Sequence, residues 1–192
     1  GGMVVTDNTL LADKIRRFRN HGISTDHHQR ARQDSWHYKM IVLGFNYRIT
    51  DIQCALGISQ LSKLEAFLKK RRAIAKIYQQ GFGESPVIHT LKLAPEVDHA
   101  YHLYVIAIEF DSIGKSRYDV FQSLRRAGIG VNVHYIPIHL HPYYRNTFGT
   151  GPGDCPVAEK MYERILSLPV YPELPVDLVE NITKMVLRST GS

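Results

Sequence analysis

The chain has 192 residues, of which 44% are apolar, and it carries 24 Lys and Arg against 18 Asp and Glu. This length can bury one core, or one core and part of another. Two distant cysteines exclude a disulfide framework, and without a long apolar run or a secretory signal we expect a cytoplasmic protein.

The first part of the chain is expected to be mostly helical. A short β-rich stretch at Met3–Thr6 precedes an amphipathic helix over Thr9–Arg19, which Gly22 helps to end. Residues 23–43 are polar and show no convincing period until residue 36, so they predict a functional or mobile loop. A second helix is capped by Thr50 or Asp51 and is expected to continue without interruption to about residue 81.

Turn formers between residues 81 and 86 mark a change of pattern, after which strands and helices alternate. We expect strands at 99–110 and within 127–139, and helices at 116–126, 154–166 and 176–187. The predicted fold class is therefore α/β (α+β). The expected domains are residues 1–82, which end in a long interdomain helix, and residues 83–192, a small α+β domain.

Positive charge is concentrated in the first part of the chain. Residues 1–82 contain 14 basic and 6 acidic side chains, whereas residues 83–192 contain 10 and 12. Asn46 and Arg48 directly precede the predicted helix start, where free N–H groups and the helix dipole favour an anion. An anion-binding loop and an ordinary turn with a solvated Arg48 are equally compatible with this pattern.

His134, His139 and His141 lie in the Pro-interrupted segment VNVHYIPIHLHPYY. No neighbouring carboxylate or Cys completes a metal site, so metal binding is the weaker interpretation. The segment is better interpreted as a strand that displays His134 and Tyr135 at its end, where both could bind a hydroxylated or phosphorylated ligand. A purely structural role for these rings remains open.

Other kinds of chemistry have less support in the sequence. We find no nucleophile with a base, no paired carboxylates and no Gly-rich phosphate loop. A nucleic-acid-binding module would need exposed aromatics among the basic residues, and the lysines and arginines instead follow helix faces. From spacing alone, the sequence predicts a soluble protein with an anion-binding loop and no identifiable reaction.

Several segments, taken in order along nearly the whole chain, resemble the DegT/DnrJ/EryC1/StrS sugar aminotransferases. They are GGMVVTDN, RNHGI, LGFNYRITDIQCALGISQL, KKRRAIAKIY, YHLYVI, GIGVNVHYIPIH and SLPVYPELP. The resemblance implies fold-type I of the enzymes that use pyridoxal 5′-phosphate (PLP), with the end of the large domain followed by the C-terminal small domain. It also implies a homodimer whose active sites are shared across the interface.

Within the family, the segments look most like enzymes of pseudaminic acid formation. The implied reaction moves an amino group from L-glutamate to C4 of a UDP-linked 4-keto-6-deoxy-N-acetylhexosamine. Perosamine-type and spore-coat polysaccharide aminotransferases share such segments and remain alternatives, as does a non-catalytic dimerising relative.

The resemblance also assigns roles to individual residues. It makes Asn46 a ligand of the PLP phosphate in the partner subunit's active site. It assigns the sugar nucleotide to Val131, Asn132, Val133, His134 and Tyr135, with Arg48 as a further candidate in the family pattern.

The Schiff-base lysine of the family lies upstream of the pair that matches Gly1 and Gly2. We therefore expect no catalytic residue in this chain and no activity from it alone. The chain departs from the family pattern between His27 and Arg32, where it is longer and more polar.

Overall fold

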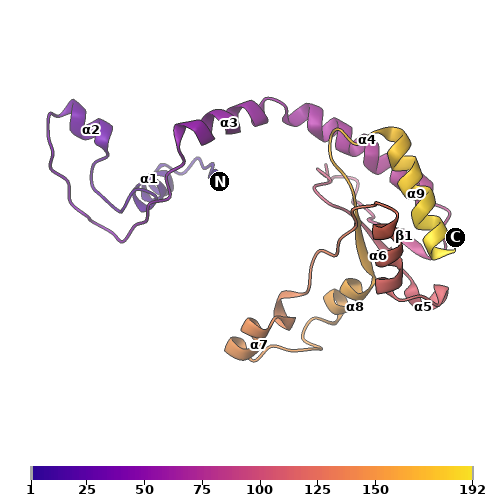
Figure 1. Ribbon diagram of the computed structural model, residues 1–192. Coiled ribbons are helices and arrows are strands. Elements are labelled where there is room, and N and C mark those ends of the chain that lie inside the picture. The colour runs from indigo at the N-terminus through magenta and orange to yellow at the C-terminus, as the bar shows by residue number, and fades with distance from the viewer. Residues whose placement is uncertain (1, 192) are drawn as a thin grey trace. The chain divides into compact units, whose positions relative to one another are not determined.

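The computed structural model describes residues 2–191 and divides the chain into two compact units, one up to Ser62 and one from Lys63 onward (Figure 1). Gly1, which belongs to the glycine pair matched to the family, lies outside the described residues. Each unit is described by itself below. In the described part of the chain, no helix is long and apolar enough to cross a membrane.

The first unit contains three helices among its described residues: α1 (Thr9–Phe18), α2 (His27–Arg32) and α3 (Asp51–Leu61). Helix α1 matches its sequence prediction because Asn8 accepts a hydrogen bond from the backbone N–H of Leu11 at the predicted start. The strand predicted at Met3–Thr6 is absent from the described residues. These residues have no pairing partner there, and a strand requires one.

The helix predicted to run without interruption to residue 81 is in fact two helices, so that prediction was wrong. Helix α3 ends at Leu61, and α4 (Leu64–Phe82) begins after two intervening residues. At the break, the Ser62 hydroxyl donates to the carbonyl of Ser59 at 2.9 Å. Ser side chains compete in this way with the backbone hydrogen bonds of a helix. The spacing of apolar residues does not report such a side-chain bond, so periodicity alone did not reveal the interruption.

The second unit is a small antiparallel sheet covered by helices. Its strands are β1 (Ile88–Thr90), β2 (Tyr104–Ile108) and β3 (Ile165–Leu168), in the order β1-β2-β3. Its remaining helices are α5 (Phe110–Ile113), α6 (Arg117–Arg126), the short 3-10 helix η1 (Ile138–Leu140), α7 (Pro142–Phe148), α8 (Pro156–Arg164) and α9 (Val176–Thr190). Figure 1 shows α9 lying along α4 beside this sheet, and the two helices are in contact.

Two sequence predictions in the second unit were wrong about which residues form strands. Residues 127–139 form no strand and pair only through one bridge between Asn132 and Ser167. The predicted helix at 154–166 ends at Arg164, because Ile165–Leu168 pairs with β2 instead. Both differences arise from long-range pairing, which a local pattern does not encode.

Helix α4 belongs to the second unit because its apolar face forms part of that unit's core. Ile74, Ala75, Tyr78 and Phe82 are at most 4% exposed. They join a core built from the sheet, α6 and α9. The observed division therefore falls at Ser62, whereas the domains expected from the sequence meet after residue 82. The division after residue 82 into the end of a large domain and a small domain stays a prediction.

The packing of α4 on α9 depends on a glycine. A Cβ atom on Gly81 would lie 2.4 Å from Cγ2 of Thr183, whose hydroxyl is bonded to the carbonyl of Val179 at 2.8 Å. Thr183 is β-branched and 6% exposed, so it has little freedom to move away.

We expect Gly81→Ala to lower the free energy of unfolding by about 1–3 kcal/mol, because the added methyl overpacks the α4–α9 contact. Denaturant unfolding of the purified protein measures this. Gly57→Ala is the matched control, since nothing lies within 4 Å of its added Cβ in α3. The control should be neutral or slightly stabilising. Equal stability of the two variants would contradict the packing argument.

Candidate functional site

The loop that contains Asn46 is bonded to the end of α1. The backbone N–H of Phe45 donates to the carbonyl of Phe18 at 2.7 Å, and that of Tyr47 donates to the carbonyl of Arg19 at 2.9 Å. Asn46 itself forms a β-bridge with Asn20. The two sequence segments RNHGI and LGFNYR are therefore one structural feature, which we call the Asn46 loop (residues 44–48) and its α1 support (residues 18–22).

Two glycines allow the loop and its support to approach each other. Gly22 has φ of 66°, and a Cβ there would lie 1.8 Å from the carbonyl oxygen of Val42. A Cβ on Gly44 would lie 2.2 Å from the backbone nitrogen of Gly22. Side chains cannot be accommodated at such distances, so both positions require glycine. The sequence offered both glycines as motif residues but did not indicate that they touch.

Asn46 and Arg48 are both exposed, and their side chains interact. The Nε of Arg48 donates to Oδ1 of Asn46 at 3.0 Å, which orients the carboxamide. Among the described residues, no hydrogen-bond partner is found for Nδ2 of Asn46. The carboxamide N–H groups and the outer guanidinium N–H groups are donors of the kind that bind a phosphate.

The start of α3 contributes less to an anion site than the sequence suggested. Thr50 and Gln53 form a reciprocal capping box, with bonds of 3.3 Å and 3.0 Å. The first turn also carries the carboxylate of Asp51, which opposes a bound anion. The anion-site hypothesis therefore depends on Asn46 and Arg48 and not on the helix start.

The segment predicted to contact the sugar nucleotide lies in the second unit, beside β3. The side chain of Val131 is 2% exposed and belongs to the core, and Val133 packs partly against it. The value covers the whole residue, so Val131 offers a ligand almost no accessible surface. Asn132 and Tyr135 are exposed, and His134 lies between them in a half-buried position.

The three histidines of this segment do not converge. His139 Nε2 lies 2.8 Å from Oε1 of Glu159, while His134 faces β3 through a contact with Ser167. Among the described residues, no group of three His, Cys, Asp or Glu side chains could hold a metal ion.

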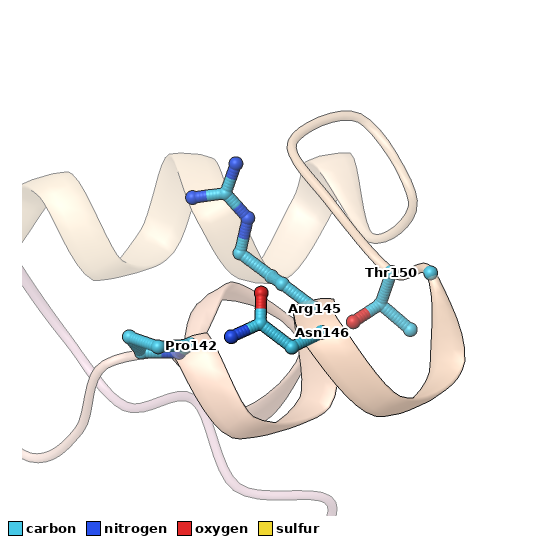
Figure 2. A pocket seen from close by; sticks show the side chains of 5 residues that line it. Pro142, Arg145, Asn146 and Thr150 are labelled. Atoms are coloured by element: carbon cyan, nitrogen blue, oxygen red, sulfur yellow. The ribbon is translucent and has the colours of Figure 1, made fainter.

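An open pocket lies on α7 and the loop that follows it. Its lining residues are Pro142, Arg145, Asn146, Gly149 and Thr150. In Figure 2 the Arg145 guanidinium and the Asn146 carboxamide extend from the helix, and the Thr150 side chain lies at the beginning of the next loop. Thr150 donates its hydroxyl proton to the carbonyl of His139 at 2.9 Å, so the pocket wall is tied to η1.

Comparison with known proteins identifies the family. The model of the DegT/DnrJ/EryC1/StrS aminotransferase family matches residues 1–187, and the chain belongs to this family. Its aminotransferases depend on pyridoxal 5′-phosphate, and the solved neighbours include a PLP form of Spr1654 from Streptococcus pneumoniae. The fold class and cofactor implied by the sequence resemblance are confirmed.

Three curated relatives illustrate the range of the family. The chain is 44% identical over 191 residues to the uncharacterized protein MJ1066 of Methanocaldococcus jannaschii, covering 97% of this chain and 50% of the relative. It is 38% identical to the spore coat polysaccharide biosynthesis protein SpsC of Bacillus subtilis (97% and 48%). It is also 38% identical to the UDP-4-amino-4,6-dideoxy-N-acetyl-β-L-altrosamine transaminase of Campylobacter jejuni (91% and 44%).

Among solved structures, the chain superposes on Helicobacter pylori PseC, an aminotransferase involved in the biosynthesis of pseudaminic acid. The TM-score is 0.85 at 30% sequence identity, over 97% of this chain and 48% of PseC. The chain thus spans about half the length of the proteins it matches.

The carboxylate of Glu159 in α8 helps to hold the loop between α7 and α8. Glu159 accepts hydrogen bonds from the backbone N–H groups of Gly153 and Cys155, in addition to its contact with His139. The hydrogen bond with His139, aided by these two backbone bonds, lowers the pKa of Glu159, although burial opposes the shift. The folded state therefore favours the carboxylate form.

We expect the Glu159 carboxylate to stabilise the fold fully at neutral pH. This stabilisation should be lost as the pH falls below about 4.5, the ordinary pKa of the carboxyl group in the unfolded chain, and the loss should continue through the lower pKa of the folded state. Glu159→Gln should lower the unfolding free energy at pH 7 and differ less from wild type at pH 4. Denaturant unfolding at both pH values measures the effect. Glu163→Gln, an exposed change on the same helix, is the control. If Glu159→Gln and wild type differ in unfolding free energy by the same amount at both pH values, the stabilising role of the Glu159 carboxylate is contradicted.

Proposed function

We propose that this chain is the C-terminal part of a PLP-dependent nucleotide-sugar aminotransferase. The reaction transfers an amino group from L-glutamate to C4 of a UDP-linked 4-keto-6-deoxy-N-acetylhexosamine, as in pseudaminic acid formation, and releases 2-oxoglutarate. The similarity to the Campylobacter jejuni transaminase and to PseC supports this substrate class. A cytoplasmic location is part of the proposal.

The observation that carries the proposal is the Asn46 loop. The backbone of α1 holds it, two glycines permit the contact, and it presents the Asn46 carboxamide beside the Arg48 guanidinium. These donors fit the dianionic phosphate of PLP. When bound, PLP supplies the electron sink for amino transfer, while the residues of this chain bind and orient.

In the proposed homodimer, Asn46 binds the cofactor phosphate in the active site of the partner subunit. Arg48 orients the carboxamide of Asn46 and offers further donors. The segment from Val131 to Tyr135 contributes to the sugar-nucleotide site through its exposed side chains, while the buried Val131 holds the segment against the core. These residue roles follow the family pattern and stand as proposals.

A second candidate is an aminotransferase of spore-coat or perosamine-type polysaccharide synthesis. The identity to SpsC equals that to the Campylobacter jejuni transaminase, so sequence similarity does not separate the two substrate classes. A non-catalytic dimerising relative is the third possibility. Glutamate-dependent amination assayed with several nucleotide-linked 4-keto sugars distinguishes all three.

We expect the intact protein to bind PLP, and we expect Asn46→Ala to weaken that binding by a factor of about 10 or more, because a hydrogen bond to a charged group is lost. Spectroscopic titration of the apoprotein with PLP measures it. Asn181→Ala, an exposed change on α9, is the control and should bind PLP like wild type. Unchanged affinity in Asn46→Ala would contradict the role of this residue.

The 192-residue chain alone should catalyse no amino transfer, because the lysine expected to bind PLP covalently lies upstream of Gly1 in the family pattern. Its absorbance spectrum after addition of PLP and its turnover of glutamate test this. Turnover, or an absorbance band of lysine-bound PLP that survives removal of free cofactor, would contradict the expectation.

A further inference from the structure

Strand β3 contains a polar side chain in an otherwise apolar, buried run. Ser167 is 4% exposed, and its neighbours Leu166 and Leu168 are 0% and 4% exposed. A buried hydroxyl normally has a hydrogen-bond partner, since leaving it unpaired is costly. The partner of Ser167 is His134: its hydroxyl oxygen lies 2.9 Å from Nδ1 of the imidazole.

The backbone brings these two side chains together. The N–H of Asn132 donates to the carbonyl of Ser167 at 3.2 Å, and the N–H of Ser167 donates to the carbonyl of Asn132 at 2.8 Å. This bridge attaches the segment before His134 to the buried strand. Because the bridge is two residues from His134, it places the imidazole over Ser167.

The geometry also determines which way the Asn132 carboxamide points. The backbone N–H of Val133 lies 2.8 Å from Oδ1 of Asn132, and a backbone N–H can only donate. The atom facing it must therefore be the carboxamide oxygen. The amide nitrogen then faces His134, where Nδ2 lies 3.2 Å from Nε2 of the imidazole.

The orientation of Asn132 fixes the proton position on neutral His134. Since Nδ2 of Asn132 can only donate, Nε2 of His134 must accept. The single proton of the neutral ring is then on Nδ1, which donates to the hydroxyl oxygen of Ser167. Both ring nitrogens are engaged inside the protein, so neither is available to a ligand.

The residue next to His134 has the opposite character. Tyr135 is 69% exposed, and its ring meets the imidazole edge-on, with the centroids 4.6 Å apart. Its phenol can donate and accept a hydrogen bond, and its ring can cover the apolar face of a sugar. The fixed imidazole restricts the positions that the Tyr135 ring can take.

We propose that Ser167 and Asn132 are positioning residues that hold His134 as its Nδ1-protonated tautomer, and that Tyr135, supported by this imidazole, contacts the sugar nucleotide. This inference rests on the proposed function. It changes the role of two residues in the segment: His134 and Asn132 act through their neighbour and do not touch the substrate. It also adds Ser167, to which the sequence resemblance assigned no role.

The tautomer is measured directly in the intact protein by nitrogen-15 NMR of labelled histidines, with the His134 signals assigned from His134→Gln. We expect Nδ1 to carry the proton in wild type. In Ser167→Ala, the population protonated on Nε2 should become detectable, and Ser167→Thr, which keeps the hydroxyl, should restore the wild-type pattern. Nε2 protonation in wild type would overturn the proposal, as would a spectrum of Ser167→Ala identical to that of wild type.

Asn132→Asp tests the proton position in a variant that is expected to fold, because Asn132 is exposed and the two side chains have the same shape. It replaces the donor that faces Nε2 with an acceptor, so His134 should become protonated on Nε2. If Ser167→Ala does not fold, this variant carries the test. A His134 that stays unprotonated on Nε2 in Asn132→Asp would overturn the proposal.

Kinetics of the intact enzyme test the contact with substrate. Ser167→Ala and Tyr135→Phe should each raise the KM for the sugar nucleotide about tenfold, equivalent to about 1.4 kcal/mol, with kcat within about twofold. Tyr118→Phe, an exposed change on α6, should leave both constants unchanged. An unchanged KM in Tyr135→Phe would overturn the contact. If wild type aminates no sugar nucleotide, the proposed function fails, while the NMR result still decides whether Ser167 and Asn132 position His134.

Discussion

Backbone pairing between segments distant in sequence is the constraint on which both candidate segments depend. Residues 45–47 are bonded to residues 18–21, and Asn132 is bonded to Ser167. In each case a segment without regular structure of its own takes its position from a helix end or a buried strand. Function-bearing loops held on a rigid scaffold in this way are common in proteins.

The two segments differ in what permits the contact. At the Asn46 loop, the backbones come so close that only glycine is tolerated at residues 22 and 44. At the second segment, a buried Ser in β3 supplies a hydroxyl for the imidazole of His134. One contact is steric and the other is polar, and both leave the neighbouring side chain, Asn46 or Tyr135, exposed.

Local signals predicted the elements that have local causes. Helix α1 begins after Asn8, α6 begins after a capping box at Ser116, and α9 begins at Val176, where their apolar periodicity predicted helices. Local signals failed where pairing decided the outcome. Residues 165 and 166 look like the end of a helix but belong to β3, and residues 127–139 look like a strand but form only a bridge.

The sequence by itself determined the family and the cofactor class and predicted the candidate site residues, because these depend on motifs that occur in order along the chain. The tertiary structure alone decided the partners of those residues: Gly44 against Gly22, Arg48 on Asn46, and Ser167 under His134. The last of these joins residues 33 positions apart. Such contacts form when the chain buries its apolar surface, which is a property of the whole fold and not of any short pattern.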